Sequence, residues 1–274
     1  MLLLSAPFDP AATAPPRGPR GALAVIAGLT GLLVAGGGGW ALVGPGPAGA
    51  GRAVILGAVH AGLIAVGWVL TTGTAPGWHR PVFRLGLAMV LASLAAGLVP
   101  WGPLALALMP LVLLVEASGH PRLRALGLAR SRIGYAALGL AAGAFLGAHL
   151  LVTASLTFGY HVGRVGAHPY ASALAYDAGA NVLSAEWLFR GAVFSALWRR
   201  GGFWPAALAS TALALVRYLL DPALPHAPEA RAGAVFYLGL VGLTACALRA
   251  WSGSLLPGYL AGLGFFGAYR LLTP

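Results

Sequence analysis

Four ionisable side chains lie inside long apolar stretches of this sequence: Asp177, Glu186, Arg190 and Arg217. An ionisable group inside a membrane span is costly, so each of these residues is a candidate for a functional role. A carboxylate in such a place could activate water as a base, and a cation could stabilise a developing oxyanion. Less strong candidates are the ionisable residues His60, Glu116 and His149 and the polar residue Asn181.

The polar residues of one apolar run follow helical spacing. Asp177, Asn181 and Ser184 stand at positions i, i+4 and i+7, so they share one helix face. Glu186 and Arg190 are four residues apart, so their side chains can meet on the same helix. Such a pairing lowers the cost of each charge and, from spacing alone, favours a self-neutralised structural pair over a functional site.

The remaining candidates have simple structural explanations. Arg217 lies near the end of its apolar run, where its side chain can extend to the membrane interface or contact Asp177 or Glu186. The two candidate histidines are isolated in sequence, which favours hydrogen-bonded core residues over metal ligands. Cys246 is the only cysteine, so it excludes an intrachain disulfide and is expected to be a small core residue.

The stretch from Ser184 to Gly191 resembles the signature of the CPBP family, the CAAX-protease and bacteriocin-processing intramembrane endopeptidases. The first motif of that family is Glu-Glu-x-x-x-Arg, usually in a Glu-Glu-Leu-Leu-Phe-Arg-Gly context. Glu186 stands at the second Glu, Arg190 at the Arg, and Ala185 at the first Glu. Phe189 and Gly191 complete the context.

Two further motif frames follow in the order of the family. The second, Phe-x-x-x-His after a Ser, falls at Ser210, with Leu213 at the Phe and Arg217 at the His. The third, His-x-x-x-Asn, follows the Gly253–Pro257 lead-in. Gly262 stands at its His and Phe266 at its Asn.

The resemblance covers residues 121–274 and implies three helices that converge on one site. In the family a Glu activates water, and His and Asn residues bind or polarise the scissile carbonyl, with a metal role argued. Ala185, Gly262 and Phe266 have no side chain that can transfer a proton or hold a metal. Arg217 can donate hydrogen bonds but cannot act as a base at neutral pH. We therefore expect no cofactor, no bound metal and an incomplete catalytic set, with Glu186 and Arg190 as motif remnants.

The elements that position these residues are apolar helices. Of the 274 residues 59% are hydrophobic and 8% charged, which is too few charges to cover a water-facing surface. The composition predicts an all-α polytopic transmembrane bundle of about eight or nine spans. The apolar runs are 21–44, 52–72, 84–99, 101–118, 133–157, 169–198, 204–220, 232–249 and 254–272. Repeated glycines at 139, 143 and 147, and at 258 and 262, predict close helix packing.

All seventeen basic residues are arginines, and most lie between the apolar runs. With a cytoplasmic N-terminus, the clusters at 17–20, 80–84, 122–132 and 199–200 all fall inside, as the positive-inside rule requires. We therefore predict a multi-pass protein of the cell membrane. Its parts are a disordered cytoplasmic tail (1–20), N-terminal transmembrane helices (21–120) and a CPBP-like intramembrane protease domain (121–274).

Three functions are compatible with the sequence. The first is a catalytically inactive CPBP homologue that acts by binding or assembly. The second is an active intramembrane endopeptidase with a rearranged site, with Glu186 as base and Arg217 as electrophilic partner. The third is a small permease-like helix bundle, which the lack of a clear internal repeat disfavours. The expected partners are membrane lipids and a membrane or lipidated peptide or partner membrane protein, and no nucleic acid.

The nine-span arrangement predicts the side of the membrane on which each chain segment lies. A reporter fused after Arg200 should read as cytoplasmic, and one fused after Pro274 as external, because three runs separate the two points. Reporters that read the same side at both points would contradict the nine-span count.

Overall fold

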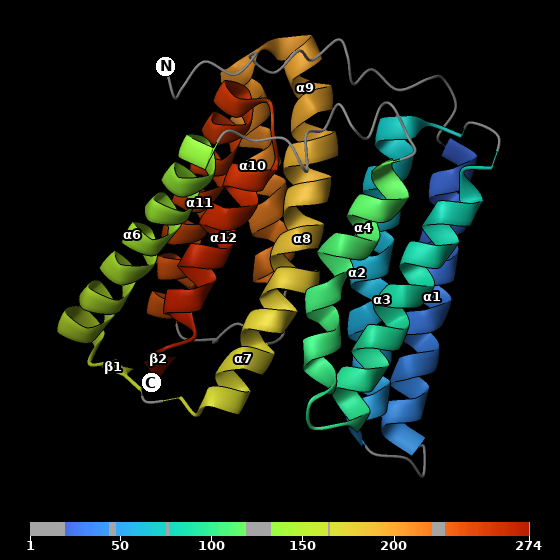
Figure 1. Cartoon of the computed structure of the whole chain (residues 1–274), viewed down its shortest axis with the longest axis horizontal. Helices are drawn as coiled ribbons and strands as arrows, with labels where there is room; N and C mark the ends of the chain where they lie inside the picture. The colour runs from blue at the N-terminus through green and yellow to red at the C-terminus, as the bar shows by residue number, and fades with distance from the viewer. Residues whose placement is uncertain are drawn as a thin grey trace. The chain divides into compact units, whose positions relative to one another are not determined.

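The computed structural model describes residues 20–43, 48–74, 77–118, 133–163, 165–220 and 228–273, which are almost entirely helical (Figure 1). The all-α prediction is confirmed. The chain divides into two compact units. Of the described residues, the N-terminal unit comprises those within 20–118 and Gly166–Leu188, and the C-terminal unit comprises those within 133–165 and 189–273. The predicted tail, apart from Arg20, and the arginine cluster at 122–132 lie outside the described residues.

The N-terminal unit contains the first helices of the chain and most of the helix that carries the first motif. Residues 166–188, which the sequence groups with the C-terminal region, are part of this unit. Its elements are α1 (Arg20–Val43), α2 (Ala48–Thr72), α3 (His79–Leu98), the 3-10 helix η2 (Gly102–Leu108), α4 (Met109–Ser118), α7 (Ala167–Tyr176), the π-helix η3 (Asp177–Asn181), α8 (Val182–Ala185) and the start of the π-helix η4 (Glu186–Val193).

The C-terminal unit contains the helices of the second and third motifs. Its elements are α6 (Ile133–Phe158), β1 (His161–Val162), the end of η4, α9 (Phe194–Gly201), α10 (Phe203–Leu219), α11 (Pro228–Ser252), α12 (Leu256–Tyr269) and β2 (Leu272–Thr273). The two short strands pair antiparallel, with His161 opposite Thr273 and Val162 opposite Leu272. Four predicted runs between the strands would return the chain to the side from which it started, which is consistent with this pairing.

Several described helices are suited to a membrane. Five are long and apolar enough to cross one: Arg20–Leu42, Gly49–Thr72, His79–Leu98, Ile133–Phe158 and Arg231–Ser252. Two shorter apolar helices span Gly102–Ser118 and Phe203–Leu219. The helices follow the predicted apolar runs closely, and together with the composition they indicate a membrane protein. The number of crossings and the orientation stay predictions.

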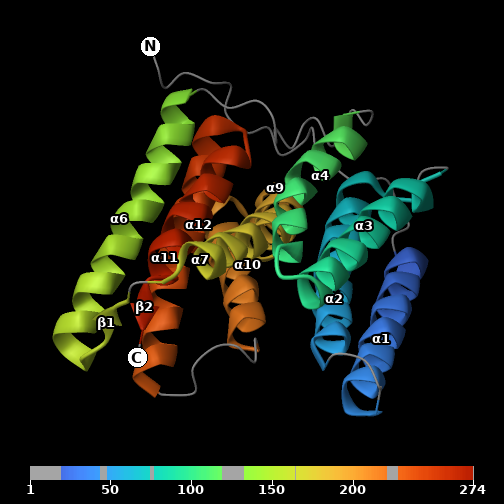
Figure 2. The same ribbon diagram turned by 60° about the horizontal axis from the view of Figure 1, so that its bottom comes forward.

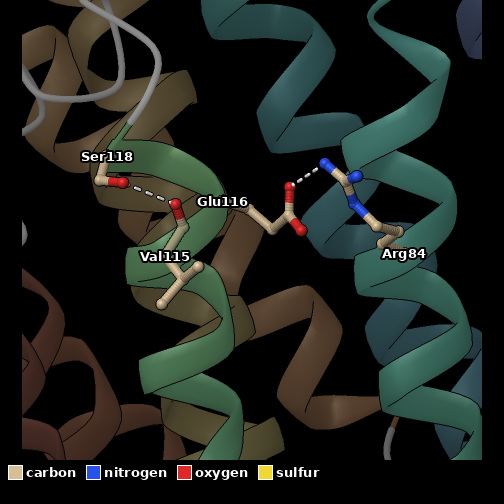
Figure 3. Close-up of polar contacts among 4 residues, drawn as sticks. All are labelled: Arg84, Val115, Glu116 and Ser118. Carbon is tan, nitrogen blue, oxygen red and sulfur yellow. Dashed lines mark hydrogen bonds and ion pairs between the residues drawn. The ribbon is translucent and has the colours of Figure 1, made fainter.

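The division between α3 and η2 settles how residues 84–118 are organised. Arg84 near the start of α3 forms an ion pair with Glu116 near the end of α4, with Nη2 2.6 Å from Oε2 (Figure 3). This contact requires the two segments to run antiparallel, with the turn at Pro100. Residues 84–118 are therefore a helical hairpin, which is the division that a nine-span count needs. Glu116, a candidate intramembrane carboxylate in the sequence, has a cationic partner.

The predicted glycine faces bring α6 and α12 into close contact. The two helices lie side by side in both ribbon views (Figures 1 and 2). A Cβ atom at Gly139 would lie 2.1 Å from the Pro257 carbonyl oxygen, and one at Gly143 would lie 1.9 Å from the Ala261 carbonyl oxygen. No real Cβ atom fits at such distances. The prediction of close packing at these glycines is confirmed, and the partner is the helix that carries the third motif.

Close packing at glycines also occurs in the N-terminal unit. In the run Gly36–Gly39, the second glycine packs against α2, where a Cβ at Gly37 would lie 2.9 Å from the Gly51 carbonyl oxygen. A Cβ at Gly179 in η3 would lie 1.7 Å from the Leu106 carbonyl oxygen of η2. Gly37 and Gly179 are therefore packing positions, whereas a Cβ at the other three glycines of the run would meet nothing within 4 Å.

Replacing Gly143 by alanine should destabilise the protein, because the added methyl group meets the backbone of α12 and forces the two helices apart. Overpacking of this kind costs about 1–3 kcal/mol. The measurement is thermal unfolding of the purified protein in nanodiscs. Gly233→Ala is the matched control, since a Cβ there meets nothing within 4 Å, and it should leave the melting temperature unchanged or raise it. Equal melting temperatures for the two variants would contradict the close crossing.

Candidate functional site

The motif positions divide between the two units. Ala185 and Glu186 lie in the N-terminal unit, and Arg190, four residues further along η4, lies in the C-terminal unit. Arg217 in α10 and the third-motif positions in α12 are also in the C-terminal unit. Each group of positions is described within its own unit.

A buried polar cluster surrounds the helix that leads to the first motif. His60 of α2 forms two hydrogen bonds. Its Nδ1 lies 2.8 Å from the Ser184 hydroxyl, and its Nε2 lies 3.2 Å from the Tyr176 hydroxyl. On the same helix, the Asn181 amide donates to the Asp177 carboxylate at 2.9 Å. The shared polar face predicted for residues 177, 181 and 184 is therefore used for internal hydrogen bonds. His60 is buried, and its expected role as a hydrogen-bonded core residue is confirmed.

The first-motif helix is held in place by Trp187. Its indole Nε1 donates to the Ile64 carbonyl oxygen of α2 at 3.0 Å. The ring lies against Gly67, where a Cβ would come within 2.6 Å of the indole, and 6.2 Å from the Trp68 ring. Residues 177–181 and 186–193 form π-helical turns, which are uncommon and are frequently found at functional sites. The contacts of Trp187 thus fix the start of η4 against α2.

Glu186 and Arg190 are both buried, at 5% and 3% of their full exposure. A Cβ added at Gly242 of α11 would lie 2.5 Å from Arg190 Nη2 and 2.7 Å from Thr211 Cγ2. The guanidinium therefore reaches α11 and α10, and it can pack there because residue 242 has no side chain. Whether Glu186 and Arg190 pair, as their spacing predicts, stays a prediction.

Aromatic rings surround the position of the family's Asn. Arg217, at the second-motif His, is partly buried and places its guanidinium 4.5 Å from the centre of the Tyr218 ring. The Tyr218 ring lies 5.9 Å from the Phe266 ring, which in turn contacts Phe265 at 5.4 Å and Tyr269 at 6.2 Å. Phe266 is buried. Phe266, which the resemblance assigns to the Asn position, is thus a ring whose neighbours are rings as well.

The turn before α12 is held by side-chain hydrogen bonds to the backbone. The Ser252 hydroxyl accepts from the Ser254 backbone N–H at 3.0 Å, and the Ser254 hydroxyl accepts from the Leu256 N–H at 3.2 Å. Gly253, at a φ of 68°, takes a left-handed conformation that favours glycine. Its carbonyl accepts from Arg249, a fully buried arginine that the sequence analysis did not single out. Its place four residues before a Gly-Ser turn is the only signal that could have identified it.

Three other candidates are placed plainly by the structure. Cys246 is buried, with its sulfur 3.5 Å from the Ser210 hydroxyl, which confirms a small core residue. Leu213, at the second-motif Phe, is 50% exposed and so does not line a buried site.

The expectation that both candidate histidines are core residues is wrong for His149, which is exposed on α6 and contacts Tyr237. The buried face of α6 is formed mainly by Gly139, Gly143 and Gly147, and His149 lies on its outer face.

The residues present do not fit a metal ion. Gly262 and Phe266 offer no ligand atom in their side chains, and Arg217 is a cation. Within the described part of the chain, no group of three or more His, Cys, Asp or Glu residues could hold a metal. The absence of a metal stays a prediction, because it rests on these residue types and not on a measurement.

Comparison with known proteins gives one match. The model of the family "Type II CAAX prenyl endopeptidase Rce1-like" matches residues 167–263, from the start of α7 into α12. No curated protein and no solved structure matches the chain. The matched range includes Glu186, Arg190, Arg217 and Gly262, and it ends before Phe266. Residues 167–263 are thus similar to the type II CAAX prenyl endopeptidase Rce1-like family, which confirms the resemblance to the CPBP family over this part of the chain.

Proposed function

We propose that this membrane protein uses a CAAX-protease-like helical framework for binding or assembly and does not cleave peptides. The single observation that carries the proposal is the set of residues at the positions of the family's catalytic groups: Ala185, Arg217, Gly262 and Phe266. Hydrolysis of a peptide bond needs a base for water and donors where negative charge develops. Ala185, Gly262 and Phe266 provide neither a base nor a hydrogen-bond donor in their side chains.

The surroundings of these residues support the same conclusion. Ala185 is buried at 1% exposure, so its position is not an open cavity that another group could fill. Phe266 is packed among Tyr218, Phe265 and Tyr269, and an apolar surface of this kind holds an ordered water poorly. Arg217 lies over the Tyr218 ring. The framework is retained while the polar groups for chemistry are replaced by packing.

The purified protein should show no cleavage of a prenylated peptide or of a helical membrane peptide. The assay measures product formation in nanodiscs by mass spectrometry, with empty nanodiscs as background. The unchanged protein and Glu186→Gln should both give the background rate, because neither is expected to cleave the peptides. The matched control is Glu116→Gln, which changes a carboxylate paired with Arg84.

The alternative enzyme would give a different result. Cleavage by the unchanged protein that Glu186→Gln abolishes and Glu116→Gln preserves would overturn the proposal. It would establish a rearranged active site with Glu186 as base. Cleavage that neither substitution affects would come from a contaminating protease, and a preparation free of that protease decides the question.

Glu186 and Arg190 should contribute to stability as a pair. Removing one member of a buried ion pair leaves a charge without compensation and costs about 3–5 kcal/mol. A double-mutant cycle with Glu186→Gln and Arg190→Met should therefore give a large coupling energy in thermal or denaturant unfolding. The control cycle uses Arg84→Met and Glu116→Gln, whose pair has a 61% exposed arginine and should couple by at most about 1 kcal/mol. Equal coupling in the two cycles would show that Glu186 and Arg190 do not pair.

A further inference from the structure

The outer surface of α6 carries a histidine at membrane depth. His149 is exposed, and it is 16 residues after the start and 9 residues before the end of the 26-residue helix. At about 1.5 Å per residue, this places it about 5 Å from the helix midpoint. A span of this length covers the hydrocarbon layer of about 30 Å with residues to spare at both ends. An imidazole on the outer face of the helix therefore lies within the apolar layer.

The two ring nitrogens of His149 have different surroundings. Nδ1 lies 2.7 Å from the Tyr237 hydroxyl and 3.3 Å from the Thr153 hydroxyl. Among the residues that the structure describes, Nε2 has no hydrogen-bond partner. Tyr237 is buried on α11 and stacks on Phe265 at 6.3 Å, so the inner side of the imidazole is fixed. A polar atom left without a partner in hydrocarbon costs several kcal/mol, so the outer nitrogen requires a partner.

His149 stands in a regular stripe of exposed residues. The positions 138, 142, 145, 149, 152 and 156 follow the alternating four- and three-residue spacing of a helix–helix seam. Position 142 is an alanine. The apolar members are between 42% and 83% exposed. They are Leu138, Phe145, Val152 and Leu156. This stripe, called the α6 seam below, has the periodicity with which membrane helices pack at small crossing angles.

The hydrogen bonding of His149 is self-complementary. The Tyr237 hydroxyl can donate to Nδ1 or accept from it, because a phenol does both. With the hydroxyl donating, Nε2 carries a proton and is a donor. With the hydroxyl accepting, Nε2 is an acceptor. Two copies of the chain in opposite tautomers can therefore join their Nε2 atoms by one N–H···N hydrogen bond, without a charged group and without rearranging their inner contacts.

We propose that the α6 seam is the contact surface of a homodimer, with His149 of each copy paired across it. A two-fold contact presents the same surface from both partners. His149 can form a hydrogen bond with its own copy, and the apolar seam can pack against its own copy. Interhelical hydrogen bonds between polar side chains stabilise such contacts in membranes. This inference goes beyond the proposed function, since it does not depend on whether the chain cleaves peptides.

Cysteine cross-linking of the full chain in membranes tests the proposal. The natural cysteine is buried, so a Cys246→Ala background leaves one introduced thiol as the reporter. Val152→Cys, on the seam, should form a disulfide-linked dimer on mild oxidation. Leu140→Cys is the matched control, since Leu140 is 48% exposed on the same helix but about 180° from His149. It should remain monomeric.

The hydrogen bond is tested by changing His149 in the Val152→Cys background. His149→Leu should weaken dimerisation about 3- to 30-fold, as expected for one intramembrane hydrogen bond. His149→Gln should retain it, since an amide also pairs with its own copy. Thermal unfolding of each variant checks that the chain is folded. Equal cross-linking at positions 140 and 152, or a dimer that His149→Leu leaves intact, would overturn the proposal. So would a seam that cross-links only to a protein of different mass, which would assign it to another partner.

Discussion

Close backbone contact at glycines is the constraint on which the arrangement of this protein depends. Lipid is as apolar as the side chains that face it, so helices in a membrane are held by packing and hydrogen bonds more than by the hydrophobic effect. In the C-terminal unit, Gly139 and Gly143 allow α6 to touch the backbone of α12 at Pro257 and Ala261. This contact fixes the depth and rotation of α12, and with them the positions that correspond to the third family motif. In the N-terminal unit, Gly67 serves the first motif in the same way by admitting the ring of Trp187. Glycine contacts therefore position the helices that carry the first and third motif frames, each within its own unit.

The replacements in the C-terminal unit have a common physical character. Tyr218 packs on Phe266, Phe266 on Phe265, and Phe265 on Tyr237, so aromatic rings are in contact from α10 through α12 to α11. Offset and edge-on ring contacts are worth about 0.5–1.5 kcal/mol each beyond the burial of their area. These ring contacts therefore stabilise the packing of α12 against α10 and α11.

The sequence predicted the helices well because each apolar run is long and is bounded by proline, glycine or arginine. It also predicted the glycine faces, since a four-residue repeat of small residues has one common structural meaning. It did not predict which helices those faces join, because the partner of Gly143 lies more than a hundred residues away. The hydrogen bonds of His60 with Ser184 and Tyr176 were out of reach for the same reason. Arg249 was missed because a single arginine at the end of a run resembles an ordinary interfacial charge, although its side chain is buried. The motif frames gave the positions of the candidate site, and the structure gave their surroundings.

The packing around Phe266 bears on whether the family's motif residues can be introduced into this chain. Asparagine at this position would place an amide among Tyr218, Phe265 and Tyr269, where rings provide few groups for hydrogen bonding. A buried amide without partners costs about 1–3 kcal/mol, in addition to the loss of the ring contacts. Histidine at Gly262 would add a side chain to the buried face of α12, in the helix that contacts α6 through glycines. A set of substitutions that restores the motif letters therefore acts against the packing of the same helix. The neighbouring rings would have to change with the motif residues, because the stability of α12 and the chemistry of the family place opposite demands on the same positions.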